Sequence, residues 1–129
     1  MKLDGFGLFV ENMDKMVKFY NNVLDFKINY KANNNNVYLE KDNVLFVMYG
    51  RKDFEKMVNK KFVYPKSFNG TIEIALSVNN FSEVDKVYKE VIKKGARAIM
   101  PPETMPWGQR TCYISDPEGN LIEIGSFNE

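Results

Sequence analysis

The sequence contains no histidine in 129 residues and only one cysteine, Cys112. Without histidine the chain cannot use a serine–histidine pair, a histidine base or an imidazole metal ligand. A single cysteine also excludes an intrachain disulfide and a zinc site built from several thiolates. Any chemistry at a site must therefore come from carboxylates, Tyr, Lys, Arg, hydroxyl groups or the backbone.

The sequence also lacks a charge excess and a long apolar run. Its 18 basic and 17 acidic residues give a formal net charge of +1, which does not provide the basic surface of a duplex-binding protein. No apolar segment approaches the roughly 20 residues of a membrane span. We therefore expect neither a nucleic-acid nor a membrane partner. The single cysteine also suits a reducing cytoplasm.

The chain repeats itself. A shift of 68 positions places Val10 on Val78, Asn12 on Asn80 and Tyr20 on Tyr88. A second offset of 77 positions aligns residues 43–45 with residues 120–122. The repeat predicts a single domain over 1–129, made of module one at 1–50, a linker at 51–70 and module two at 71–129.

Each module is predicted to contain a strand, a helix and three further strands. The first strands, 3–10 and 71–78, alternate apolar residues with small or polar ones, so one face packs under a helix and the other borders a cavity or interface. The helices are expected from Met13 to Leu24 and from Phe81 to Ile92. The later strands are expected at 26–32, 36–41 and 43–50, and at 97–101, 109–115 and 120–126. This βαβββ layout, present twice, predicts the α+β class.

The linker at 51–70 carries five lysines among four aromatic residues. One interpretation is a lid or dimer contact; the other is a solvated linker with a helical turn around residues 54–59. We expect a linker that gives partial cover, because long connections that carry aromatics are often functional.

Several segments resemble the vicinal oxygen chelate superfamily, which includes glyoxalases, bleomycin-resistance proteins, fosfomycin-resistance enzymes and extradiol dioxygenases. Residues 10–26 resemble its first strand and helix, and residues 74–78 resemble the opening of its second module. Trp107-Gly108 and the stretch Asp116 to Ile124 resemble its closing hairpin. The resemblance implies eight strands curled into a cup around a central pocket, and a homodimer.

The resemblance also identifies four positions at which metalloenzyme members hold a metal ion. These positions are Gly5, Glu73, Phe46 and Glu123, and Phe46 could slip by one to Val47. Two of the four therefore offer no ligand. We expect no cofactor, and the alternative is a labile divalent metal on Glu73 and Glu123, since hard cations accept carboxylate oxygens.

Two carboxylates that face one cavity repel each other and need a partner. Arg110, near the pocket rim by the resemblance, is one candidate; a cationic or hydrogen-bond-donating ligand is the other. Trp107 and Phe46 would supply apolar wall, and Tyr113 a hydrogen bond. The expected pocket residues are Gly5, Gly7, Phe46, Glu73, Ala75, Trp107, Arg110, Tyr113 and Glu123.

Three functions follow from this hypothesis. The leading one is a metal-independent protein that binds or sequesters a small organic ligand in the cup. The second is a metal-dependent lyase or isomerase resembling lactoylglutathione lyase, or a dioxygenase, with Glu73 and Glu123 as catalytic candidates. The third is a structural or regulatory module with an empty cup.

Overall fold

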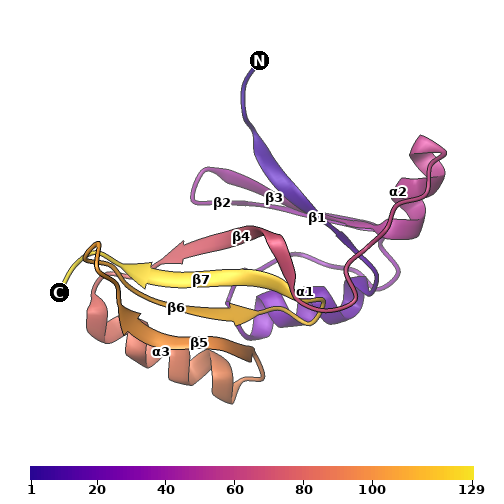
Figure 1. The fold of residues 1–129 in the computed structure, drawn as a ribbon. Coiled ribbons are helices and arrows are strands. Elements are labelled where there is room, and N and C mark those ends of the chain that lie inside the picture. Colours follow the sequence, from indigo (N-terminus) through magenta and orange to yellow (C-terminus); the bar gives the residue numbers. More distant parts are fainter. The chain divides into compact units, whose positions relative to one another are not determined.

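The computed structural model describes all residues, 1–129, as an α+β chain of two compact units. Unit 1 comprises Met1–Tyr64 and unit 2 comprises Pro65–Glu129. The boundary between them lies inside the predicted linker. Each unit contains its own sheet (Figure 1), in agreement with the predicted fold class and repeat.

Unit 1 has a three-stranded sheet in the order β1-β3-β2. β1 and β3 are parallel, and β2 and β3 form an antiparallel hairpin. Its elements are β1 (Gly5–Val10), α1 (Met13–Asn22), β2 (Asn36–Lys41), β3 (Val44–Gly50) and α2 (Arg51–Val58).

Unit 2 has a four-stranded sheet in the order β4-β7-β6-β5. β4 and β7 are parallel, whereas β6 is antiparallel to both of its neighbours. α3 lies along one face of this sheet (Figure 1). The elements are β4 (Asn69–Ser77), α3 (Phe81–Lys93), β5 (Arg97–Thr104), β6 (Arg110–Ser115) and β7 (Asn120–Ser126). None of the three helices is long and apolar enough to span a membrane.

The helix that follows the first strand of each unit begins at an equivalent asparagine. The Asn12 side chain accepts a hydrogen bond from the backbone N–H of Lys15, and Asn80 accepts one from Glu83, each at 3.0 Å. These bonds satisfy N–H groups that the first turn leaves without a partner. Gly95, with φ of 109°, follows the end of α3. The repeat therefore extends to the helix caps.

Buried residues in each sheet alternate with less buried ones, and the buried face packs under a helix. In unit 1 the Phe46 ring lies against Tyr20 of α1 at 5.2 Å and against Phe26 at 5.5 Å between centroids. In unit 2, Ile122 and Ile124 are buried together with Val84 of α3. We call the opposite side of each sheet its open face.

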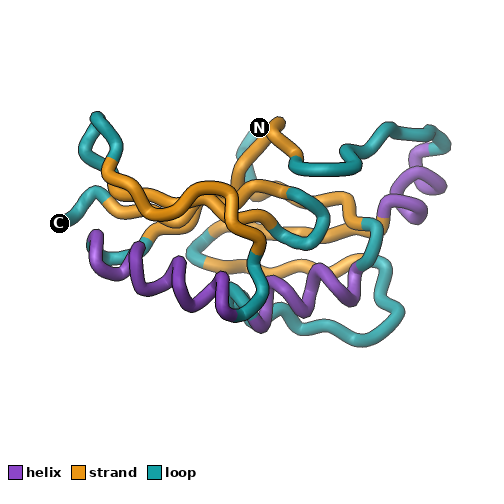
Figure 2. The backbone as a smooth tube through the Cα atoms, turned by 60° about the horizontal axis from the view of Figure 1, so that its bottom comes forward, coloured by secondary structure: helices purple, strands orange, loops and turns teal.

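The predicted strand at 26–32 is wrong, and module one has one strand fewer than expected. Residues 23–35 contain no helix or strand (Figure 2). Lys27 adopts a φ of 61°, which lies in the left-handed region and outside the range of a regular strand. The Asn21 side chain also binds both the N–H and the C=O of Ile28, at 2.6 and 2.9 Å. The backbone groups that a neighbouring strand would need are thus already paired.

The connections before the last strands differ between the units. The β2–β3 hairpin turns through Asp42 and Asn43, with φ of 51° and 64°, as a two-residue loop requires. The β6–β7 connection is longer, and the buried Asp116 carboxylate accepts the backbone N–H groups of Glu118 and Asn120 at 2.9 and 3.0 Å. Gly119 there has φ of 88°, a left-handed conformation that favours glycine.

The linker begins with a helix. α2 starts at Arg51, three residues before the predicted helical turn, and packs on β1 and β3 within unit 1. Phe54 of α2 stacks on Phe9 with ring centroids 4.0 Å apart. Phe9 and Tyr49 belong to the open face, because they alternate with the buried residues Leu8, Val10 and Met48. α2 thus covers part of that face.

Candidate functional site

The open face of unit 2 carries four of the residues expected at a site. Ala75 of β4 and Tyr113 of β6 are both register partners of Glu123 on β7. Glu73 lies two residues before Ala75 on the same strand. The parity of the strands places all four opposite the buried residues Ile74 and Ile122. The alternation in the sequence of the first strand therefore placed Glu73 and Ala75 on the same face of the sheet, as in the structure.

The Glu123 carboxylate is held by two neutral donors. Its Oε1 atom accepts hydrogen bonds from Nε2 of Gln109 at 3.0 Å and from the hydroxyl of Thr111 at 2.9 Å. Gly125 makes room for this arrangement, because a Cβ atom there would lie 2.7 Å from Gln109 Nε2. The carboxylate therefore has a fixed orientation, and Oε2 takes no part in either bond.

Gln109 extends this network to Trp107. The indole Nε1–H donates to Oε1 of Gln109 at 3.0 Å, and the Trp107 side chain is otherwise largely exposed. The sequence analysis did not identify Gln109 or Thr111 as site residues. The signal was present: residues 109, 111 and 113 are polar and alternate with the apolar Cys112 and Ile114.

Tyr113 and Glu73 form a second pair on this face, joined by a hydrogen bond between their side chains. Burial of the Tyr113 hydroxyl raises its pKa well above the ordinary value of 10, and the bond to Glu73 and the charge of Glu123 act in the same direction. Tyr113 therefore remains a protonated hydrogen-bond donor at neutral pH.

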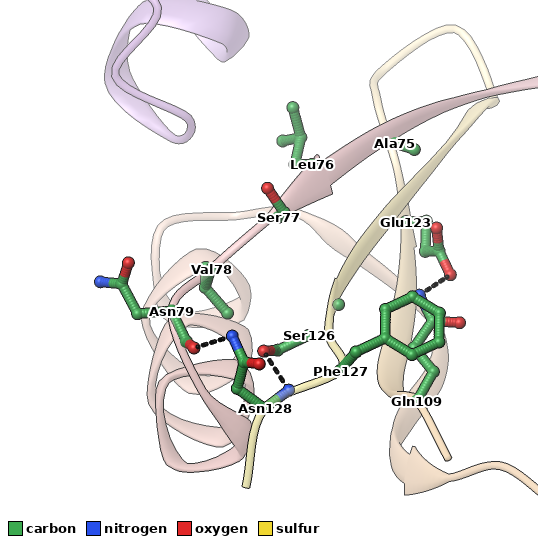
Figure 3. A pocket seen from close by; sticks show the side chains of 11 residues that line it. Ala75, Leu76, Ser77, Val78, Asn79, Gln109, Glu123, Ser126, Phe127 and Asn128 are labelled. Carbon is green, nitrogen blue, oxygen red and sulfur yellow. Dashed lines mark hydrogen bonds between the residues drawn. The ribbon is translucent and has the colours of Figure 1, made fainter. Parts of the chain in front are cut away.

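A pocket of about 540 Å³ lies at the carboxyl end of β4 (Figure 3). Residues 75–79, Gln109, Glu123 and residues 125–128 line it. Figure 3 shows the bond from Gln109 to Glu123 on one side and the Phe127 ring beside it. Of the expected pocket residues, only Ala75 and Glu123 line this pocket; Glu73, Trp107 and Tyr113 do not.

Arg110 does not have the role that the sequence suggested. Its guanidinium binds Oδ1 of Asp85 on α3 through Nε and Nη2, and it donates to Thr104 through Nη1. Since residue 110 alternates with 109 and 111, its side chain lies on the helix side of the sheet. Arg110 therefore does not neutralise Glu73 or Glu123.

Unit 1 places its expected site residues differently. Phe46 is buried in the aromatic core under α1, so it does not form the wall of an open-face pocket. The strand register explains this difference. In unit 1 Gly7 pairs with Val47, and the equivalent pair in unit 2 is Ala75 with Glu123. Val47 is thus the equivalent of Glu123, and the slip by one residue is the correct alignment. Gly5 lies against β3, where a Cβ atom would be 2.0 Å from the Leu45 carbonyl oxygen.

The four positions that correspond to family metal ligands are therefore Gly5, Val47, Glu73 and Glu123. Glycine has no side chain and valine has no donor atom, so only two carboxylates remain. In addition, no three His, Cys, Asp or Glu residues come together in a group that could hold a metal ion. These residues do not fit a metal site with four protein ligands.

Comparison with known proteins agrees with this architecture. "Uncharacterized protein YraH" of Bacillus subtilis (strain 168) is 27% identical over 127 residues, which cover 96% of this chain and 97% of that protein. A glyoxalase/bleomycin resistance protein/dioxygenase from Nocardioides superposes with a TM-score of 0.83 at 18% identity, over 100% of this chain and 85% of the other. A glyoxalase-related enzyme from Fulvimarina pelagi gives 0.82 at 17% identity, over 97% and 87%.

The two solved structures establish the fold, and the family follows from the sequence. Residues 2–124 match the model of the Glyoxalase/Bleomycin resistance protein/Dioxygenase superfamily, which is nearly the whole chain. The chain belongs to the Glyoxalase/Bleomycin resistance protein/Dioxygenase superfamily.

Proposed function

We propose that this chain binds a small organic ligand on the open face of unit 2 and does so without a tightly bound metal. The observation that carries the proposal is the Glu123 carboxylate, which lines a pocket of about 540 Å³ and is oriented by Gln109 and Thr111. This volume lies within the range of small-molecule sites. A convergent polar group in such a pocket fixes the orientation of its ligand.

The carboxylate selects the kind of ligand. Both donors to Glu123 are neutral, and the nearby Arg110 is engaged with Asp85. A ligand with an ammonium or another hydrogen-bond donor would supply the missing partner. A hydrogen bond to a charged group contributes about 1.5–3 kcal/mol, which is a factor of roughly 10–100 in affinity.

The binding part is tested by NMR titration of the ¹⁵N-labelled protein with a panel of open-chain and ring-containing amines, alcohols and amides. Compounds that carry a donor should shift the backbone amide resonances of Ala75, Glu123 and Gly125. Glu123→Gln should weaken their binding about tenfold or more, as expected for loss of a charged acceptor. Glu103→Gln on β5 is the matched control and should bind as the unchanged chain does. Equal affinity in Glu123→Gln, or no shift with any compound, would show the proposal to be wrong.

The metal part is tested separately. The protein is purified without chelator, dialysed against 10 µM Zn²⁺, Ni²⁺ or Mn²⁺ (about 10 µM is well above the dissociation constant of a tight protein site), and analysed for metal content. We expect far less than one ion per chain. One ion per chain that is lost in the double variant Glu73→Gln/Glu123→Gln would overturn metal independence.

A further inference from the structure

The parallel ladders of the two units have the same register, so their residues can be matched pair by pair. Gly5 opposite Leu45 corresponds to Glu73 opposite Leu121. Four residues further along each strand, Phe9 opposite Tyr49 corresponds to Ser77 opposite Gly125. All these pairs lie on the open faces. The side chain that packs at a given position on the open face of unit 1 therefore indicates what kind of group could bind at the equivalent position of unit 2.

In unit 1 an aromatic ring occupies the place at the end of the ladder. The Phe54 ring from α2 stacks on Phe9 at 4.0 Å with an interplanar angle of 24°. It also meets Tyr49 edge-on, at 6.2 Å and 90°. Stacked and edge-on arrangements are the favourable geometries for a pair of aromatic rings. In unit 1 the ends of β1 and β3 thus hold a planar ring on the open face.

In unit 2 the same place is part of the pocket. Ser77 and Gly125 replace the two rings of Phe9 and Tyr49, and both residues line the hollow. Glycine lets a ligand approach the backbone closely. The Phe127 side chain, which is 67% exposed, adds an aromatic wall at the rim (Figure 3).

We propose that this pocket binds the planar aromatic ring of a small ligand at Ser77 and Gly125, in the place that corresponds to Phe54 in unit 1, with a donor group of the ligand at Glu123. This inference rests on the proposed function and names its ligand class. Glu123 and Gly125 are two residues apart on one strand, or roughly 6.6 Å at 3.3 Å per residue. The ring and the donor should therefore be separated by a short chain of two or three atoms, as in an arylalkylamine.

Three probes that share a skeleton test the ring. These are 2-phenylethylamine, its saturated analogue 2-cyclohexylethylamine and the neutral 2-phenylethanol, each titrated into ¹⁵N-labelled protein. The aromatic amine should shift the amides of Ser77 and Gly125 and bind at least tenfold more tightly than either analogue. Equal affinity for 2-cyclohexylethylamine would show that the site does not select an aromatic ring. The proposed binding of a donor group at Glu123 would not be affected by that result. No shift at Ser77 and Gly125 with the aromatic amine would overturn the proposed position of the ring.

A substitution that introduces the unit 1 residue at the equivalent position of unit 2 tests where the ring binds. Ser77→Phe introduces the ring that stands at position 9 and should weaken 2-phenylethylamine binding more than tenfold. Thr71→Phe adds the same ring to the same strand outside the pocket and should leave affinity unchanged. Ser77→Val narrows the hollow with fewer atoms and serves if the larger substitution prevents folding. Unchanged affinity in a folded Ser77 variant would show that the ring binds elsewhere.

Discussion

Single residues on β6 show how strongly the side of the sheet determines chemistry. Glu123 is the register partner of Tyr113, while Cys112, one residue earlier, lies in the core. Burial raises the pKa of the Cys112 thiol to about 11. Cys112 is therefore a small residue of the core.

Cys112 should be unreactive in the folded protein. With a pKa of about 11, roughly one thiol in a thousand is ionised at pH 8, and thiolate is the reactive form. Iodoacetamide at pH 8 should therefore leave native protein unmodified for hours, whereas protein in guanidinium chloride should react fully within minutes. The extent of alkylation is read by mass spectrometry. Rapid native labelling at pH 8 would contradict this burial.

Residue-scale prediction had a clear limit in module one. The facing of Glu73 and Ala75 followed from the alternation of their strand. Phe46 was aligned with Glu123 by sequence similarity, but the strand registers make Val47, the partner of Gly7, the equivalent of Glu123, the partner of Ala75. The two-residue turn at Asp42 is shorter than the Asp116 turn, and a slip of one residue moves a side chain to the opposite face. Sequence identity across turns of different length could not reveal that slip.

At the scale of elements, tertiary contacts overrode a local pattern. Residues 26–32 alternate apolar and polar side chains, as strands do, and Phe26 and Ile28 are indeed buried. The hydrogen bonds from Asn21 nevertheless pair the backbone of Ile28 with a side chain of α1. A side chain seven residues away that substitutes for a strand is not visible in a pattern of hydrophobicity.

Asn21→Ala should destabilise unit 1. It removes two hydrogen bonds and leaves the N–H and C=O of Ile28 without partners, which costs about 1–3 kcal/mol. The free energy of unfolding in urea measures this loss. Asn22→Ala, at the exposed neighbouring position of α1, is the matched control and should change stability much less. Equal stability of the two variants would argue against the role given to Asn21.

At the scale of the whole molecule, the two units share one strand register but differ in what lies on their open faces. The end of the ladder in unit 1 is filled by Phe54 of α2, and the same end in unit 2 is hollow. The repeat itself was visible in the sequence at Val10, Asn12 and Tyr20. The content of the open face of unit 1 was not, because it depends on where α2 packs. The expected homodimer stays a prediction.

Phe54→Ala should therefore affect stability rather than binding. The loss of a half-buried ring that contacts Phe9, Tyr49 and Phe62 should cost about 1–3 kcal/mol, less than a fully buried phenylalanine. Chemical denaturation measures the loss, and Met57→Ala, an exposed apolar residue of α2, is the control. The affinity for 2-phenylethylamine should not change. A variant with full stability and weakened binding would reverse this division between the units.

The hydrogen bond between the indole of Trp107 and Gln109 has a practical consequence. Trp107 is the only tryptophan of the chain, so its emission comes from one place. Gln109 bonds the indole through Oε1 and the Glu123 carboxylate through Nε2. If a ligand binds Glu123 as proposed, it should disturb this amide and change the surroundings of the fluorophore. We therefore expect Trp107 emission to report occupancy of the pocket in unlabelled samples.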